Sequence, residues 1–444
     1  MKYCNQCGFR DDDNSAKFCS RCGNLFKYFP DASESIADTS KLAKKRRECK
    51  YHPVTYDKLK QLCDDVNVNL ADIDTSWIKN MHELFAESER IHDQFNGIEQ
   101  WNVCYVTNMS GMFYGAESFD HDISNWDVSH VQDMSNMFSY ANRFDRLIGN
   151  WDVSYVRDMQ GMFYGALCFN QDIGRWDVSH VENMDDMFMG CESLESLNLS
   201  NFNTANVENM ESMLTGCSSL ESLDLSNFNT SNVVQMDYMF CSCSSLTSLD
   251  LSMFITSKVK QMHNMFNGCS SLTSLDLSNF DTSKVISFSK FLKDCLSLKS
   301  LTINFKTNEA IDLSFMFISC KLLTSIDISN FITNKVRNIS GIFKDCESLT
   351  FLDFSKFITN EVIDMSHMIQ NLNKLTSIDI SSFNTDKVVN MSYMFYNCKQ
   401  LKSIDVSNFN TKNVINFSNM FYYCNSVEQL NISNFNTEKS EDLS

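Results

Sequence analysis

The chain has 444 residues, with 37 Lys and Arg against 56 Asp and Glu, and a formal net charge of −19 at pH 7. The charge is uneven, because residues 1–60 carry a net +5 and residues 61–444 a net −24. Such an acidic chain repels nucleic acid and anionic lipid, so contacts of that kind would fall to the N-terminal residues. No run of 18 apolar residues occurs and no apolar stretch follows Met1, so we expect neither a membrane span nor a classical signal peptide.

The first predicted element is a small zinc ribbon over residues 1–26. Two Cys-x-x-Cys-Gly knuckles supply four thiolates, from Cys4, Cys7, Cys19 and Cys22. Four thiolates suit a closed tetrahedral site, in which no position is left for catalysis. We therefore expect one structural Zn²⁺, with iron as the alternative, since four thiolates also accept iron. Thiolate ligands favour a reducing compartment, so we expect a cytoplasmic protein, with the cell surface reached by a non-classical route as the alternative.

A polar linker over residues 27–54 and a helical N-terminal cap over residues 55–70 follow. The linker carries six clustered cations, Lys41, Lys44, Lys45, Arg46, Arg47 and Lys50. This cluster fits either a nucleic-acid or anionic-surface contact or a solvated linker. In the next segment Leu59, Leu62 and Val66 have helical spacing. We expect this helix to cover the open apolar end of the repeats.

From residue 71 to residue 444 one motif recurs about 14 times, with a period of 25 or 26 residues. At Cys217 to Phe240 it reads CSSLESLDLSNFNTSNVVQMDYMF. Such a period predicts a solenoid, because each unit is too small to bury its own apolar face and must stack on its neighbours. The opening cysteine returns at Cys243, Cys269, Cys295, Cys320, Cys346, Cys398 and Cys424.

Two periodicities alternate within each copy. Residues 220–225 (LESLDL) end in a period of two, which predicts a short strand. Residues 233–243 place apolar side chains three or four apart, which predicts a short helix with one buried stripe. Thr230 precedes that segment, and we expect its hydroxyl to cap the helix. The predicted fold class is an α/β repeat solenoid of short strand plus short helix, preceded by the zinc ribbon.

The aromatic position of the repeat has two forms. Early copies read WDVS, at Trp126, Trp151 and Trp176, and later copies read FNT or FIT, as at Phe228. The WDVSxVxxMxxMF pattern resembles the BspA-like leucine-rich repeat family and its DUF285 repeat, and the two knuckles resemble a short bacterial zinc-ribbon module. The resemblance implies a leucine-rich-repeat solenoid, and family members are often bacterial surface proteins implicated in adhesion or host contact. Where the usual repeat has asparagine this chain has the aromatic, so we expect an aromatic ladder instead.

Nine of the 18 cysteines occupy one repeat position, where early copies carry Ala116, Ala141 and Ala166. Free cysteine packs like a small apolar side chain, so we expect reduced thiols in the core. Disulfides between neighbouring units are the alternative, because strand spacing falls within disulfide range.

One outward position of the predicted strands is repeatedly aspartate. The residues are Asp224, Asp250, Asp276, Asp327, Asp353, Asp379 and Asp405. We call these seven residues the aspartate stripe. Stacked carboxylates repel one another, so something must offset the repulsion. The stripe either forms a hydrogen-bond ladder encoded by the repeat or docks a basic partner or divalent cations.

The sequence contains no recognisable catalytic arrangement. The eight histidines show no ligand spacing, and no glycine-rich phosphate loop or catalytic triad order emerges. We therefore expect a non-enzymatic scaffold that binds another protein, of unknown identity, along an extended leucine-rich-repeat surface. Two alternatives stay open: a bacterial surface adhesin exported without a classical signal, and a regulator that contacts nucleic acid through the zinc ribbon and basic linker.

Overall fold

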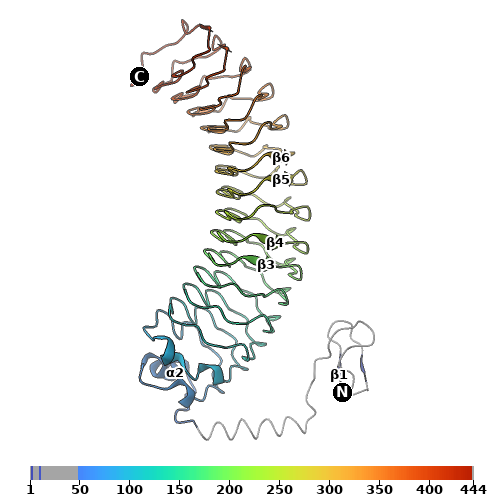
Figure 1. Ribbon diagram of the computed structural model, residues 1–444, viewed down its shortest axis with the longest axis vertical. Helices are drawn as coiled ribbons and strands as arrows, with labels where there is room; N and C mark the ends of the chain where they lie inside the picture. The colour runs from blue at the N-terminus through green and yellow to red at the C-terminus, as the bar shows by residue number, and fades with distance from the viewer. Residues whose placement is uncertain (1, 4–9, 12–48, 443–444) are drawn as a thin grey trace.

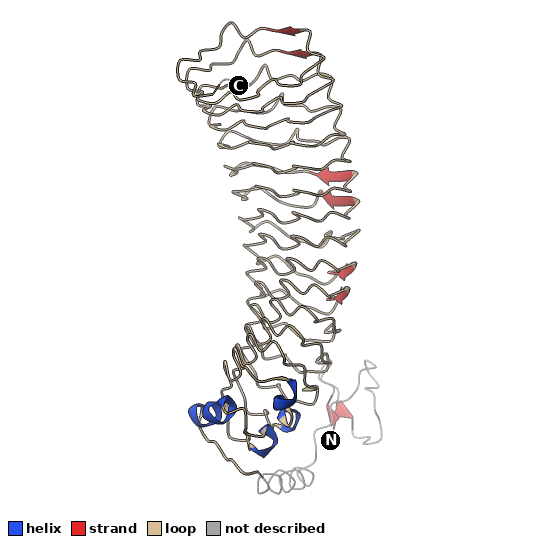
Figure 2. Cartoon of the chain, turned by 60° about the vertical axis from the view of Figure 1, so that its left-hand side comes forward, coloured by secondary structure: helices blue, strands red, loops and turns tan. Residues whose placement is uncertain are grey.

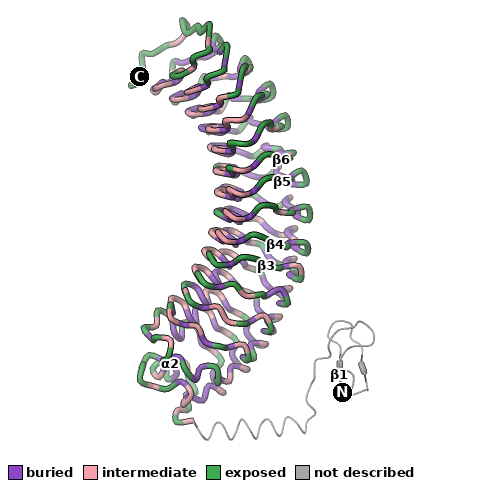
Figure 3. Tube along the Cα trace, viewed as in Figure 1, coloured by how far each residue is buried: buried purple, intermediate pink, exposed green. Residues whose placement is uncertain are grey.

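The computed structural model describes residues 2–3, 10–11 and 49–442. The repeats form an elongated, gently bent stack in which each copy is one coil (Figure 1). Before residue 49, β1 (Lys2–Tyr3) pairs antiparallel with β2 (Arg10–Asp11). Buried residues line the inside of the coils and exposed residues lie on their outer edges (Figure 3).

The helix α2 (Tyr56–Asp64) lies against the first coils. Its Leu59 and Cys63 are buried, whereas Val66 lies beyond the helix and is exposed. The buried guanidinium of Arg90 donates to the carbonyl of Cys63 at 2.9 Å, which ties the helix to the stack. This helix lies where the leucine spacing predicted one.

The remaining described helices are short 3-10 turns near the same end of the stack (Figure 2). They are η1 (Leu70–Asp72), η2 (His92–Phe95) and η3 (Ile98–Gln100). Across the described part of the chain, we find no helix with the length and apolar character needed to cross a bilayer.

Short strands lie along one side of the stack (Figure 2). They pair in parallel, β3 (Ser196–Asn198) with β4 (Ser222–Asp224), β5 (Ser274–Leu277) with β6 (Ser300–Ile303), and β7 (Ser403–Ile404) with β8 (Gln429–Leu430). Each register shifts by one copy, so Leu197 lies opposite Leu223. The predicted strands are therefore present in these coils, at the predicted place.

The predicted short helices are wrong, because residues 233–243 and their equivalents in the described coils contain a bridge residue, Gln235 in this copy, followed by consecutive turns at residues 237–242. Tyr238 and Ser242 have positive φ, at 58° and 60°, which no α-helix allows. Alternate N–H groups donate to the next coil, as from Tyr238 to the carbonyl of His263 at 3.0 Å. Because these N–H groups donate to carbonyls of the next coil, they cannot make the i to i−4 hydrogen bonds of an α-helix. The apolar stripe is nevertheless buried, as Met236 and Phe240 show.

A single column of parallel bridges links each coil to the next at the start of these turns. The bridging residues are Asn80, Asn108, Asp133, Asp158, Asn183, Asn209, Gln235, Gln261, Ser287, Asp312, Asn338, Asp364, Asn390, Asn416 and Asp442. Many also close a turn with their own side chain, as Asn108 Oδ1 does by accepting from the N–H of Ser110 at 2.8 Å. These short polar side chains therefore fix where each turn begins.

Buried threonines form a second column between the coils. Thr230 donates its hydroxyl to the carbonyl of Ile255 at 2.9 Å and accepts from the N–H of Ile255 at 2.7 Å. The prediction that Thr230 caps a helix is therefore wrong, since its hydroxyl crosses to the next coil. The hydroxyl bond to the following coil recurs at Thr204, Thr256, Thr282, Thr307, Thr333, Thr359, Thr385 and Thr411.

The nine repeat-position cysteines lie in one column and are free thiols. Each donates to a carbonyl one coil back, as Cys217 Sγ does to Phe188 at 3.2 Å. Burial raises the pKa of Cys217 well above its usual range, which makes the thiol unreactive. The cysteines thus serve as small core residues with one weak hydrogen bond between coils.

The expected aromatic ladder is present in part of the stack. The rings of Phe228, Phe254 and Phe280 stack with centroids 6.4 Å apart. Asparagine contributes as well, which we did not expect, because Asn279 Nδ2 donates to three carbonyls of the preceding coil at 3.0–3.3 Å. The asparagine stands one residue before the aromatic, so both side chains bind adjacent coils together.

Candidate functional site

The four predicted zinc ligands, Cys4, Cys7, Cys19 and Cys22, lie outside the described residues. The zinc site therefore stays a prediction. Within residues 49–442, no three histidine, cysteine or carboxylate side chains are grouped as metal ligands.

The structure places the aspartate stripe at one exposed position of successive coils. Parallel register sets equivalent residues side by side, as with Asp276 opposite Thr302. Thr302 therefore divides the stripe into two runs, Asp224 to Asp276 and Asp327 to Asp405. Strand spacing separates neighbouring carboxylates in a run by roughly 5 Å at the backbone.

Each aspartate of the stripe closes a turn in its own coil. Asp250 Oδ1 accepts from the N–H of Ser252 at 2.9 Å, and the other six bind the serine two residues on at 2.9–3.0 Å. Hydrogen bonds from these serines lower the pKa of every stripe aspartate, so the carboxylates are ionised at neutral pH. These bonds run within coils and recur with the repeat. The turn that each aspartate closes explains why aspartate recurs at this position. The carboxylates still form an exposed acidic row along the stack.

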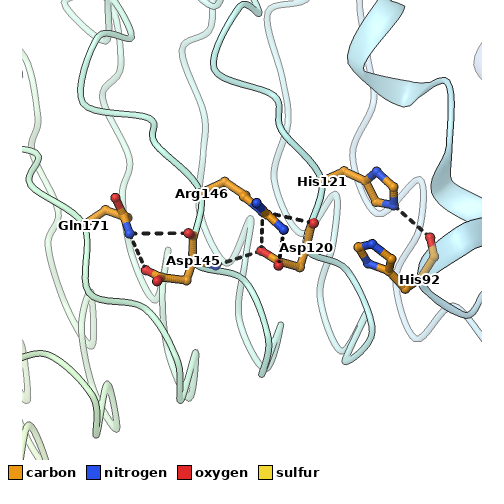
Figure 4. A network of polar contacts seen from close by, with 6 residues as sticks. All are labelled: His92, Asp120, His121, Asp145, Arg146 and Gln171. Carbon is orange, nitrogen blue, oxygen red and sulfur yellow. Dashed lines mark hydrogen bonds and ion pairs between the residues drawn. The ribbon is translucent and has the colours of Figure 1, made fainter.

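A second polar row crosses the early coils and was missed at the sequence level (Figure 4). The guanidinium of Arg146 binds the carboxylate of Asp120 in a bidentate pair, in which Nε donates to Oδ1 at 2.8 Å and Nη2 donates to Oδ2 at 2.6 Å. Gln171 Nε2 donates to Asp145 Oδ1 at 2.7 Å in the same way. Arg146 and Gln171 each bind an aspartate of the preceding coil, so this row stabilises the contact between neighbouring coils.

The row of Figure 4 begins with two stacked histidines. The rings of His92 and His121 lie 4.4 Å apart, and His121 Nε2 lies 2.8 Å from the carbonyl of His92. An open groove of about 490 Å³ lies beside them, lined by charged side chains that include Asp93, Glu117 and Arg143. Mixed charges line this groove, so it favours neither sign of ligand.

Three carboxylates stack at one position of the turn segment, a cluster the sequence reasoning also missed. Asp185, Glu211 and Asp237 stand in consecutive copies, and His263 follows at the same position. Burial raises the pKa of Asp237 to about 6, although His263 Nδ1 pairs with its Oδ1 at 2.6 Å. Burial, reinforced by repulsion from the neighbouring carboxyl groups of Asp186 and Glu211, raises the pKa of Asp185 to about 7. The signal was available, since acidic residues recur there directly beside the predicted buried stripe, as Asp237 does next to Met236.

Comparison with solved structures found leucine-rich-repeat proteins at low identity. A TLR13–ssRNA13 complex is 16% identical with a TM-score of 0.26, and the match covers 80% of this chain but only 52% of that chain. A leucine-rich cell surface protein from Faecalibacterium prausnitzii is 15% identical with a TM-score of 0.32, covering 63% of this chain and 85% of that one. A leucine-rich repeat protein from Eubacterium ventriosum is 14% identical with a TM-score of 0.33, covering 75% and 84%.

Comparison with curated protein sequences found no match. A family model described as "Mycoplasma protein of unknown function, DUF285" matches this chain in overlapping segments. They are residues 56–172, 141–248, 167–275, 191–301, 241–350, 271–377 and 349–444. Together these segments span the whole coil stack and α2, so the chain belongs to the DUF285 family.

Proposed function

We propose that this protein is a non-enzymatic scaffold that binds another protein along the outer surface of its coils. One observation carries the proposal: the stack repeats the same exposed positions at a fixed spacing through residue 442, while the polar groups between coils fasten one coil to the next. Such a surface suits a large partner that contacts many coils, because binding energy in protein interfaces comes from a few side chains spread over a broad area.

The proposal includes a structural Zn²⁺ at Cys4, Cys7, Cys19 and Cys22, and a cytoplasmic location. Four thiolate ligands support a reducing compartment, because disulfides form readily in oxidising ones. Protease treatment of intact and lysed source cells tests the location. Loss of the protein from intact cells would instead favour the surface adhesin.

The scaffold proposal is tested by crosslinking in intact source cells that carry the full chain with an affinity tag. We expect one protein, or a few, to be recovered in near-stoichiometric amounts after stringent washing, and none with the tag alone. Recovery of nucleic acid that depends on residues 1–54 would favour the regulator instead. Recovery of no macromolecule above the tag control would contradict the scaffold.

A further inference from the structure

Five exposed aromatic or imidazole side chains occupy one position in five successive coils. They are Trp77, Tyr105, His130, Tyr155 and His180, and we call them the aromatic row. The exposed fractions of Trp77, Tyr105 and Tyr155 are 58%, 59% and 65%. Tyrosine and tryptophan are enriched at protein interfaces, so a repeated exposed position of this kind marks a candidate contact surface.

The backbone holds this row in register. Two residues after each of the last four members, an N–H donates to the carbonyl of the equivalent residue one coil back, as from Gln132 to Thr107 and from Arg157 to Gln132, each at 2.8 Å. Buried valines flank the last four positions, as Val153 and Val156 do around Tyr155, and buried Thr75 and Ile78 flank Trp77. Neighbouring members are therefore about 5 Å apart at the backbone, and Tyr105 and Tyr155, two coils apart, about 10 Å.

The last four members of the row lie in the most acidic part of the stack. Residues 88–216 hold five Lys and Arg against 20 Asp and Glu, a net −15. Residues 217–442 hold 18 against 22, a net −4. An aspartate also stands three residues before each of the last three members, at Asp127, Asp152 and Asp177. The aromatic faces and the negative potential therefore coincide.

The same position changes character where the acidity ends. Following coils carry Asn206 and Asn232 there, and then Lys258 and Lys284. Two cations stand two residues after a member of the row: Lys79, and Arg157, which is paired with Glu182 at 2.8 Å so that its charge is offset locally. Aromatic side chains beside carboxylates attract cationic side chains, both through the ring faces and through charge.

We propose that the aromatic row binds an extended, arginine- or lysine-rich segment of a partner protein. This inference rests on the proposed scaffold function and adds the chemistry of its partner. A segment in the extended polyproline II conformation advances roughly 3.1 Å per residue with three residues per turn, so every third side chain returns to the same side after about 9 Å. Cations three residues apart would therefore meet Tyr105 and Tyr155 in turn.

The test uses the full chain and two labelled synthetic peptides of identical composition. One repeats Arg-Ser-Ser four times, and the other groups its four arginines together. Binding is followed by fluorescence anisotropy at low and physiological salt. We expect tighter binding of the spaced peptide, and a weakening of about five- to thirtyfold in the double variant Tyr105→Ala/Tyr155→Ala, from two lost cation–π contacts. Tyr422→Ala is the matched control, since Tyr422 is 53% exposed on a distant, less acidic coil.

Two results would overturn the proposal. Equal affinity for both peptides that does not change in the double variant would mean attraction by net charge alone. Binding of neutral cellohexaose that the double variant abolishes would make the row a glycan site. The scaffold proposal is judged separately. If the double variant recovers the crosslinked partner equally well, the aromatic row is not its binding site, but the scaffold proposal still holds.

Discussion

The threonine column offers a direct test of how the coils are held together. The hydroxyl of Thr230 is fully buried and makes two hydrogen bonds to the backbone of Ile255, at 2.9 and 2.7 Å. Thr230→Val keeps the shape, removes both bonds and frees one donor and one acceptor. Each hydrogen bond contributes about 1 kcal/mol net, and Ile255 is 49% exposed, so water can reach its freed backbone groups and we expect a loss of about 2 kcal/mol.

Thr230→Ser is the matched control, because it keeps the hydroxyl and loses one methyl group, which costs about 1 kcal/mol. Thr247→Val, at an exposed threonine, should change stability by about 0.5 kcal/mol or less. Repeat proteins need not unfold in one step, so the assay is amide hydrogen exchange across residues 243–268, with urea unfolding as a check. Exchange there should accelerate about thirtyfold or more in Thr230→Val. Equal effects of Val and Ser at position 230 would refute the assignment of the hydroxyl to the next coil.

Three further predictions follow from single positions. Gly190 has a φ of 75°, a left-handed conformation that β-branched residues disfavour. We therefore expect Gly190→Asn to be tolerated and Gly190→Val to lower the midpoint of urea unfolding clearly. Equal midpoints for the two variants would contradict this. The pKa of Asp185 is raised to about 7, so the folded chain binds the proton more tightly than the unfolded chain and stability falls as pH rises from about 4 towards 7. Asp185→Asn should flatten this fall in stability between pH 5 and 7.5. Asp250→Asn is the control, because the pKa of Asp250 is lowered, and it should lose stability at pH 7.5. The same pH profile for Asp185→Asn and the unsubstituted chain would refute the prediction for Asp185. Elemental analysis should find one zinc per chain, and none in the double variant Cys4→Ser/Cys19→Ser. Cys168→Ser is the control and should keep its zinc. Metal retained in the double variant would contradict the predicted zinc ribbon.

The repeat period alone predicted which side chains are buried. Met236, Phe240 and Cys243 have fully buried side chains, as their spacing indicated. The same spacing could not distinguish an α-helix from tight turns, because both return a side chain to the same face after three or four residues. The missed signal was glycine at one position of the later turn, at Gly115, Gly165, Gly190, Gly216 and Gly268, all with positive φ. Asn371 and Asn397 take this position elsewhere, and asparagine also tolerates the left-handed conformation.

The candidate surfaces were predictable in part. A period of two placed Asp250 and its equivalents outward, and the structure has them exposed. The direction of their hydrogen bonds was not predictable, because a short carboxylate can reach either its own turn or the next coil. The aromatic row needed only a comparison of equivalent positions, since Tyr105, His130, Tyr155 and His180 recur every 25 residues. The exposure of these side chains depends on the turn geometry, which the helix prediction had wrong.

The most direct test of the scaffold is a photo-crosslinking residue placed in the full chain inside source cells. It is put at position 155, in the aromatic row, and in a separate variant at position 422. The account predicts a discrete protein adduct from position 155 and none, or a much weaker one, from position 422. No protein adduct from either position would contradict the claim that this protein works by binding a partner along its coils, and equal adducts from both would contradict the aromatic row as the place where that partner binds.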